Sequence, residues 1–282
     1  MQVVEEVSAL RALVQSWKQA GLKVGFVPTM GNLHQGHLSL VEIAQQQCDR
    51  VIVSVFVNPM QFGPDEDFDR YPRTFIADSE KLQQIATDAV FVPAVEEMYP
   101  NGLEQTVVSV PASITELLEG ASRPGHFDGV STVVSKLFNM VQPDVAVFGQ
   151  KDYQQLLVIK RMVEDLALPI EIIAAPIARE QDGLALSSRN QYLSEQQRLV
   201  APILNSILKE IADNIDSGNR DYAALASSAT SKLLTAGFDS VDYIQVSDPI
   251  TLKPALPDSD AFIILAVAFL GNTRLLDNLL LN

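Results

Sequence analysis

Two of the three histidines, His34 and His37, lie in the segment PTMGNLHQGH at positions 28–37. A short apolar run precedes it, so we expect a strand to end here, Gly31 to allow a tight turn, and a helix to begin. Side chains three positions apart share a helix face. A helix N-terminus favours phosphate, and two imidazoles add donors for charge that develops at phosphorus. The alternative is a pair of capping or core histidines, but the strand–turn–helix context favours a phosphate site.

A second candidate follows the strand predicted at 145–148, in the stretch FGQKD. Lys151 supplies a compact cation for a phosphate, and the Asp152 carboxylate can accept hydrogen bonds from ribose hydroxyls. Parallel sheets bind ligands at the carboxyl ends of their strands, which is where this stretch should lie. A surface Lys–Asp pair is the simpler alternative, and the position after a strand argues against it.

The polar loop at 178–193 contains Ser187, Ser188 and Arg189 in succession. Two hydroxyl groups and a forked guanidinium suit a triphosphate, and a loop can close over a bound nucleotide. The competing interpretation is a serine-rich linker between domains.

Two glutamines, Gln61 and Gln155, each come after a predicted strand. Neutral amides can hold hydroxyl groups and a carboxylate without reducing the nucleophilicity of that carboxylate as a tight arginine pair would. Met30, Phe56 and Phe62 could line an apolar wall beside them, although core packing is the default interpretation of such residues. Taken alone, both glutamines would more often face solvent.

The elements that must position these residues alternate between strands and helices. We expect strands at 23–27, 51–57, 89–92, 145–148 and 170–174, and helices at 3–20, 34–47, 75–87, 130–142 and 153–166. Such alternation predicts an α/β fold, a Rossmann-like, doubly wound parallel sheet.

The pattern changes after Pro176. Two long helices are expected at 195–214 and 221–236, followed by strands at 241–247, 261–270 and 273–281. This order predicts a smaller α+β domain. The expected domains are therefore residues 1–176, which would bind nucleotide and acid substrate, and residues 177–282, which would act as a lid.

Composition excludes several classes of protein. The 282 residues carry a formal net charge of −15, which does not suit a nucleic-acid binder. A single cysteine, Cys48, excludes an internal disulfide. The chain begins without a secretion-signal pattern, and its longest apolar run, 261–270, is too short to span a bilayer. We therefore expect a cytoplasmic protein with small-molecule substrates and neither nucleic-acid nor membrane partners.

His-x-Gly-His after a first strand resembles the nucleotidyltransferase superfamily. The longer string VPTMGNLHQGHLSLV resembles the pantoate–β-alanine ligase (pantothenate synthetase) family in particular. Four further blocks with the same resemblance follow in order: FVNPMQFGPDEDFDRYPRT at 56–74, RPGHFDGV at 123–130, FGQKDYQQL at 148–156 and SSRNQYLS at 187–194. They span the expected first domain and the start of the second.

The resemblance implies an AMP-forming ligase that condenses (R)-pantoate with β-alanine through a pantoyl adenylate and releases pyrophosphate. It implies catalytic roles for His34, His37 and Lys151, and a homodimer. The residues it implies for ATP are Met30, Gly31, His34, His37, Gly149, Lys151, Asp152, Ala178, Leu186, Ser187, Ser188 and Arg189. Those it implies for pantoate and β-alanine are Asn58, Gln61, Arg123 and Gln155.

ATP is expected as a substrate with Mg²⁺ bound mainly to its phosphate oxygens. No residue is assigned as a metal ligand, because the chain has Ala77-Asp78 where the family can carry paired aspartates. The acidic residues at 65–69 suggest a solvated loop. At position 186 the family commonly has methionine, and leucine of similar volume should serve equally well.

Two other classes of function remain open. One is another adenylyltransferase of the superfamily, which would join AMP to a phosphorylated acceptor and release no free AMP. The other is a nucleotide sensor that binds ATP without turnover. A tRNA-charging enzyme is disfavoured by the acidity of the chain and the lack of a basic extension.

Overall fold

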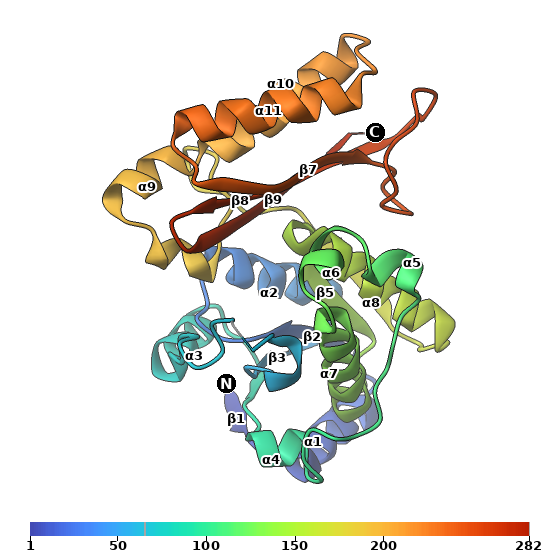
Figure 1. Ribbon diagram of the computed structural model, residues 1–282. Coiled ribbons are helices and arrows are strands. Elements are labelled where there is room, and N and C mark those ends of the chain that lie inside the picture. Colours follow the sequence, from blue (N-terminus) through green and yellow to red (C-terminus); the bar gives the residue numbers. More distant parts are fainter. Residues whose placement is uncertain (65, 282) are drawn as a thin grey trace. The chain divides into compact units, whose positions relative to one another are not determined.

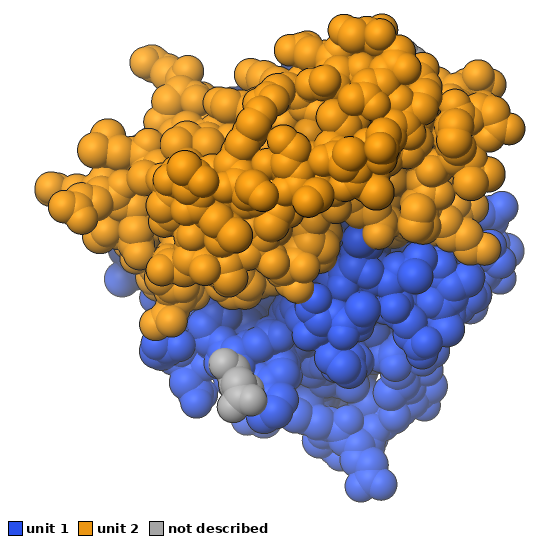
Figure 2. Space-filling view, turned by 45° about the horizontal axis from the view of Figure 1, so that its top comes forward, with its two compact units in different colours: residues 1–150, 154–176 blue, residues 151–153, 177–282 orange. Residues whose placement is uncertain are grey.

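The computed structural model describes residues 1–64 and 66–281. The chain divides into two compact units, coloured separately in Figure 2. The first unit comprises residues 1–150 and 154–176, and the second comprises residues 151–153 and 177–282. The short segment Lys151–Tyr153 thus groups with the second unit, although it begins two residues after a strand of the first unit ends at Gly149.

The first unit is built on a parallel sheet, whose strands β1, β2, β3 and β5 are labelled in Figure 1. Its strand order is β1-β4-β3-β2-β5-β6. Every neighbouring pair in it is parallel, which confirms the predicted fold class. The strands are β1 (Gln2–Val4), β2 (Val24–Thr29), β3 (Arg50–Val55), β4 (Ala89–Phe91), β5 (Val145–Gly149) and β6 (Glu171–Ala175).

Helices cover both faces of this sheet because alternate strand residues point to opposite sides. Phe26 belongs to a core cluster with residues of α1, α7 and α8, whereas Val27 belongs to a second cluster with residues of α2 and α3. The helical segments are α1 (Val7–Gln19), α2 (Gln35–Gln47), η1 (Pro59–Gln61), α3 (Phe75–Gln84), α4 (Val95–Met98), α5 (Ala112–Thr115), α6 (Leu118–Ser122), α7 (His126–Val141), η2 (Gln150–Asp152) and α8 (Tyr153–Asp165).

The direction of winding reverses between β2 and β5. From β2 the chain proceeds to β3 on one side, and from β5 it proceeds to β6 on the other, while β2 and β5 are themselves paired. Ligands of open α/β sheets bind beyond the carboxyl ends of the strands at such a switch point. The segments that follow β2 and β5 begin at Met30 and Gln150, so both histidines and Lys151 lie on the first segments after the two switch-point strands.

The second unit combines an antiparallel sheet of β7 (Ser240–Ser247), β8 (Phe262–Leu270) and β9 (Thr273–Leu281) with helices. Its helical segments are η3 (Ser188–Tyr192), α9 (Glu195–Val200), α10 (Ile203–Asp216) and α11 (Tyr222–Ala236). Alternate residues of β8, from Phe262 to Leu270, share a core cluster with the apolar stripe of α10. Within the described residues, no helix is both long and apolar enough to cross a membrane.

Two predictions about elements were wrong. The helix expected at 3–20 begins only at Val7, because residues 2–4 form β1 and pair with Ala89–Phe91. The single helix expected at 195–214 is two helices, α9 and α10, separated at Ala201–Pro202. Pro202 has no backbone N–H to donate to the preceding turn, and it serves instead as the N-cap of α10.

Candidate active site

The turn after β2 requires glycine at position 31. Gly31 has a φ of +82°, and a Cβ there would lie 3.0 Å from Val55 Cγ1 and 3.2 Å from Asp78 Oδ2. A side chain would be strained by the backbone and crowded by both neighbours. The tight turn predicted at Gly31 is therefore confirmed, and it sends the chain from Met30 directly into the histidine segment.

Asp78 on α3 fixes this turn by accepting hydrogen bonds from its backbone. Its carboxylate is fully buried and accepts hydrogen bonds from the backbone N–H groups of Asn32 (2.8 Å) and Leu33 (2.7 Å), and from the Thr74 hydroxyl (3.1 Å). Lys81, one turn further along α3, donates to the Leu33 carbonyl at 2.6 Å. No role is predicted for Asp78 from the sequence. Of its partners only Thr74 is local, whereas Asn32 and Leu33 lie 46 and 45 residues away, so nothing local indicates that Asp78 binds the turn.

His34 and His37 come together as predicted, but by a different route. His34 is the N-cap of α2 rather than a helical residue, and the two side chains form a reciprocal capping arrangement. Gly36 N–H donates to His34 Nδ1 at 3.1 Å, and His34 N–H donates to His37 Nδ1 at 3.3 Å. The ring centroids lie 4.0 Å apart with the planes tilted by 35°.

This capping arrangement fixes which ring nitrogen carries the proton. Because each Nδ1 accepts a backbone N–H, a neutral ring must carry its hydrogen on Nε2. A neutral His34 or His37 therefore carries its ring hydrogen on Nε2 at the start of α2.

The loop that carries Ser187, Ser188 and Arg189 begins with a narrow hairpin. Leu186 N–H donates to the Ala178 carbonyl at 2.9 Å, so these two predicted ATP-binding residues are brought together. Ser187 caps η3 by accepting the Arg189 N–H at 3.2 Å. The Ser187 hydroxyl hydrogen is not used by this cap.

A buried ion pair supports the hairpin. Arg179 binds both oxygens of Asp277 on β9, at 2.7 and 2.8 Å, and the Asp277 side chain is only 3% exposed. Arg179 also donates to the Gly183 carbonyl at 3.1 Å within the hairpin, and Asn205 donates to Asp277 at 3.3 Å. A bidentate arginine–carboxylate pair has a well-defined geometry, so it fixes the base of the loop on the strand.

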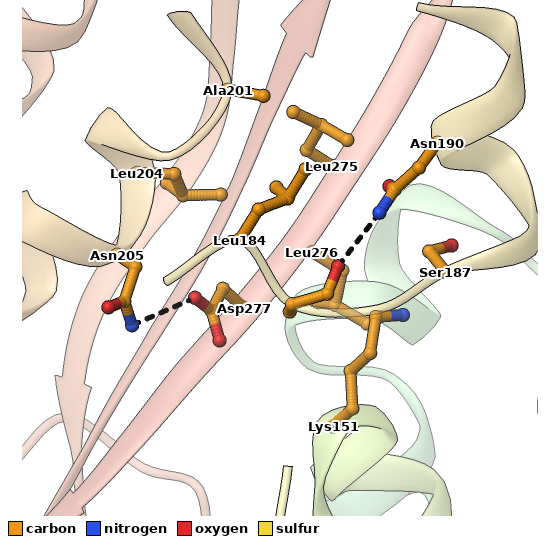
Figure 3. Close-up of a pocket in the computed structure, with 11 residues that line it drawn as sticks. Lys151, Leu184, Ser187, Asn190, Ala201, Leu204, Asn205, Leu275, Leu276 and Asp277 are labelled. Carbon is orange, nitrogen blue, oxygen red and sulfur yellow. Dashed lines mark hydrogen bonds between the residues drawn. The ribbon is translucent and has the colours of Figure 1, made fainter. Parts of the chain in front are cut away.

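Lys151 lies beside this loop within the second unit. Its side chain and those of Ser187 and Asn190 line one small cavity of about 10 Å³, close to the minimum volume for a water molecule (Figure 3). The Lys151 carbonyl accepts a hydrogen bond from Asn278 Nδ2 at 2.8 Å. Lys151 and Ser187 thus lie on the same cavity within the second unit. Asp152 is half-exposed, with its carboxylate 4.0 Å from Lys151 Nζ.

In the first unit, Gln61 lies at the end of η1 and its side chain is held by Asn58. Asn58 Nδ2 donates to Gln61 Oε1 at 3.1 Å, and Gln61 Nε2 lies 3.3 Å from Met30 Sδ. Asn58, expected as a substrate-binding residue, is fully buried and its amide is engaged with protein groups. Gln155 is half-buried on the first turn of α8.

The residues expected to form an apolar wall divide between two environments. Phe56 is buried in the core and packs against the Tyr99 ring, with centroids 6.0 Å apart. Phe62 makes edge contacts with Phe68 and Tyr71 in the loop after η1. Met30, by contrast, is half-buried and contacts the Gln61 amide.

Arg123 is engaged by protein groups rather than pointing outwards. It binds both carboxylate oxygens of Glu66 (2.7 and 2.5 Å), one oxygen of Glu119 (3.0 Å) and the Gln61 carbonyl (3.3 Å). Although burial raises the pKa of Glu66, the hydrogen bond and charge of Arg123 hold it below the ordinary value. The structure therefore gives Arg123 a supporting position around Gln61.

His126 completes the support of the Gln61 backbone. Its Nε2 lies 3.1 Å from Arg123 Nη1 and its Nδ1 lies 2.8 Å from the Gln61 carbonyl. A guanidinium only donates and a carbonyl only accepts, so Nε2 accepts and Nδ1 carries the hydrogen. Burial and the adjacent Arg123 charge lower the pKa of His126 to about 4, which keeps the ring neutral near pH 7.

Among residues 1–64 and 66–281, no group of three or more His, Cys, Asp or Glu side chains is arranged to hold a metal ion. Asp78 already accepts three hydrogen bonds. In the acidic segment 65–69, Glu66 is paired with Arg123, whereas Asp65 lies outside the described residues.

The chain is similar to proteins of one family along its whole length. The family model described as pantoate-beta-alanine ligase matches residues 2–280. Curated proteins named pantothenate synthetase are 61% identical in Hydrogenovibrio crunogenus, over 100% of both chains, and 56% identical in Pseudomonas putida strain W619, over 99% of this chain and 97% of that one.

Solved structures give the same result. A pantothenate synthetase from Thermus thermophilus matches with a TM-score of 0.90 and 47% identity, over 99% of both chains. A pantoate-beta-alanine ligase from Francisella tularensis, complexed with beta-gamma ATP and beta-alanine, matches with a TM-score of 0.84 and 35% identity, over 99% of this chain and 97% of that one.

Proposed function

The chain belongs to the pantoate-beta-alanine ligase family, and from this membership we propose that it joins pantoate to β-alanine through a pantoyl adenylate. The reaction consumes ATP, in keeping with the nucleotide and β-alanine of the Francisella complex. The sites and steps that follow are part of this proposal.

In the first step, a carboxylate oxygen of pantoate attacks the α-phosphorus of ATP. The bond from that phosphorus to the oxygen that bridges it to the β-phosphorus breaks, and pyrophosphate leaves. No general base is needed, because a carboxylate is already ionised at pH 7. The protein must instead align the reactants and stabilise charge on the phosphate oxygens.

The observation that carries the proposal is the pair of imidazole rings after β2. His34 and His37 lie with their rings in contact after β2, at the switch-point edge of the sheet, and this is where a phosphate oxygen would be received. We propose that Lys151, Ser187, Ser188 and Arg189 bind the triphosphate with them. Met30, Gly31, Gly149, Asp152, Ala178 and Leu186 would contact the rest of ATP.

Pantoate is assigned to Gln61 and Gln155. The Gln61 amide accepts from Asn58, so its N–H groups remain to bind an acceptor oxygen of the acid, beside the apolar Met30 side chain. We propose supporting roles for Asn58 and Arg123 rather than direct substrate contact, because their polar groups already bind the segment that carries Gln61.

In the second step, the β-alanine amine attacks the acyl carbon of the adenylate. The bond from that carbon to the phosphate oxygen breaks, AMP leaves with that oxygen, and the amine loses a proton as the amide forms. Mg²⁺ would enter as part of the MgATP substrate, held by phosphate oxygens. From the family resemblance we further propose a cytoplasmic homodimer.

The exchange of labelled pyrophosphate into ATP tests the adenylate. The proposal predicts exchange that requires pantoate and proceeds without β-alanine, because the first step is reversible on its own. Exchange in the absence of pantoate would contradict it. Free AMP should form only when both pantoate and β-alanine are supplied. If the protein binds ATP but releases no pyrophosphate under any of these conditions, it is a nucleotide sensor and not a ligase.

A further inference from the structure

Asn58 is the centre of a buried hydrogen-bond network that reaches Gln61. Its side chain has no exposed surface. Asn58 Oδ1 accepts from the Met60 N–H (3.2 Å) and the Tyr99 hydroxyl (2.5 Å), while Nδ2 donates to Gln61 Oε1 and the Gly129 carbonyl, both at 3.1 Å. Two donors and two acceptors thus occupy the whole hydrogen-bonding capacity of the amide.

These partners permit only one orientation of the Asn58 amide. The Met60 N–H can only donate, so it must face Oδ1, and the Gly129 carbonyl can only accept, so it must face Nδ2. If the amide were flipped, a donor would face a donor and an acceptor would face an acceptor. Unpaired groups in a buried site are costly, so the network is directional.

The orientation of the Asn58 amide also sets the orientation of the Gln61 amide. Since Asn58 Nδ2 faces Gln61 Oε1, the Gln61 N–H groups point away from Asn58, and Nε2 lies next to Met30 Sδ. A thioether is a weak acceptor, and an oxygen of a bound acid would bind these hydrogens better. The network therefore presents Gln61 as a donor and leaves its acceptor oxygen committed to the protein.

Tyr99 is the distant member of this network. It lies 41 residues from Asn58 along the chain, directly after α4, and is 3% exposed. Phe56 and Lys136 hold its ring, with Phe56 at 6.0 Å between centroids and Lys136 Nζ at 5.2 Å from the ring centre. Burial raises the pKa of the Tyr99 hydroxyl, so it retains the hydrogen that it donates.

We propose that Tyr99 is a positioning residue for the ligase reaction. The Met60 N–H and the Gly129 carbonyl set the orientation of the Asn58 amide. The Tyr99 hydroxyl, as the fourth partner, holds that amide in place with Nδ2 on Gln61 Oε1. The Gln61 N–H groups thereby stay turned towards the acid substrate. This inference rests on the proposed role of Gln61 in binding pantoate. Tyr99 itself contacts no substrate in this account. The consequence is selectivity for an acid that offers an acceptor oxygen at this point.

Tyr99→Phe tests the inference, since it removes one oxygen and keeps the ring. We expect the KM for pantoate to rise about tenfold, the factor that corresponds to about 1.4 kcal/mol, while the KM for ATP stays unchanged. Tyr222→Phe is the matched control, because it removes a buried hydroxyl from the second unit and should leave both constants unchanged.

A double-variant cycle separates positioning from a merely structural role. Gln61→Met keeps the approximate volume and removes the amide, so it should raise the KM for pantoate by itself. If Tyr99 acts through Gln61, then Tyr99→Phe should change this KM less than twofold in the Gln61→Met background. An equal change in both backgrounds, or no change in the wild-type background, would overturn the inference.

The same cycle distinguishes a failure of the proposed role of Gln61 from a failure of the inference about Tyr99 alone. If Gln61→Met has the wild-type KM for pantoate, the proposed role of Gln61 fails and the role of Tyr99 fails with it. If Gln61→Met is impaired and Tyr99→Phe is not, only the inference about Tyr99 fails. Thermal unfolding of each variant verifies that the compared enzymes are folded at the assay temperature.

Discussion

The hydrogen-bond network of Asn58, Gln61 and Tyr99 (the Gln61 network) in the first unit and the Ser187–Arg189 loop in the second use different polar groups, and these groups are held in different ways. The Gln61 side-chain amide accepts a hydrogen bond from the buried Asn58, and the Gln61 backbone carbonyl accepts one from the buried His126. The loop carries hydroxyl groups and a guanidinium, and its residues 187–189 are half-buried rather than buried. Its support, the Arg179–Asp277 ion pair, binds the preceding hairpin and not the predicted ligand-binding groups themselves.

The contrast follows from the chemistry of the side chains. An amide has a donor end and an acceptor end, so it can recognise an acid only if neighbours fix its orientation. A guanidinium or ammonium donates in every orientation, and a hydroxyl can rotate. A site made of cations and hydroxyls can therefore lie on a loop, whereas a site made of amides needs a rigid, non-local environment.

The largest effect on activity is expected from Lys151, which we place with the Ser187–Arg189 loop on the triphosphate. Lys151→Ala should lower kcat by about 10²–10³, or about 3–4 kcal/mol, because it removes a donor to charge that develops in the transition state. The KM for pantoate should change little, because Gln61 is unaffected. Steady-state kinetics would measure both, with the exposed Lys160→Ala on α8 as the control. Wild-type turnover would exclude the proposed role of Lys151.

Acid should lower the stability of the folded protein through His126, which supports the Gln61 backbone. Its pKa is about 4 in the folded protein, against an ordinary value of 6.5, so as the pH falls the unfolded chain takes up the proton first. Stability is therefore lost between about pH 6.5 and pH 4. At 1.36 kcal/mol per pH unit, the difference amounts to about 3 kcal/mol.

Urea unfolding at pH 7 and pH 4 measures this loss. His126→Gln lacks the titrating ring, so its free energy of unfolding should fall by about 3 kcal/mol less than that of the wild type over this range. Parallel pH dependences for the two proteins would mean that His126 is protonated in the folded state as readily as in the unfolded chain.

Gly129→Ala should displace Gln61 by a steric clash with the η1 segment. A Cβ at Gly129 would lie 2.2 Å from the Met60 carbonyl oxygen and 2.7 Å from Gln61 Cα, so α7 and η1 would have to separate. We expect kcat/KM for pantoate to fall about 100-fold, equivalent to about 2.7 kcal/mol, within the usual cost of overpacking. Gly63→Ala should remain within twofold, because its Cβ meets Glu66 only at an ordinary 3.5 Å. Equal activities of the two variants would contradict this close packing.

The smallest effect is expected at Leu186 in the second unit. Leu186→Met introduces the residue that the family commonly has there and nearly conserves volume. The KM for ATP should change less than twofold, since only backbone groups of Leu186 and Ala178 are paired. A tenfold change would indicate that the side chain at 186 shapes the nucleotide site.

How far the sequence predicts the molecule depends on the range of the contacts. His34, His37 and Lys151 follow strands whose apolar runs are recognisable, and the turn at Gly31 is encoded locally. The network around Gln61 is not, because Tyr99 and Gly129 reach Asn58 across 41 and 71 residues. The strand at residues 2–4 was missed for a similar reason, since three residues have no usable periodicity and their partner is β4.

The roles of Asn58 and Arg123 show the same limit. Their positions in the motifs predict closeness to the substrate but not the direction in which the side chains point. Only the packed structure reveals that Asn58 is fully buried and that Arg123 binds Glu66 and Glu119. A short sequence pattern can locate a polar residue at a site, but whether it contacts substrate or supports another residue depends on distant segments.

Transfer of ¹⁸O from the carboxylate of pantoate tests whether the reaction passes through a pantoyl adenylate. If the carboxylate oxygen attacks the α-phosphorus, each turnover should leave one ¹⁸O atom in AMP, which mass spectrometry of the isolated nucleotide detects. Unlabelled AMP would exclude attack of the carboxylate on the α-phosphorus, as would ADP formed together with ¹⁸O-labelled inorganic phosphate.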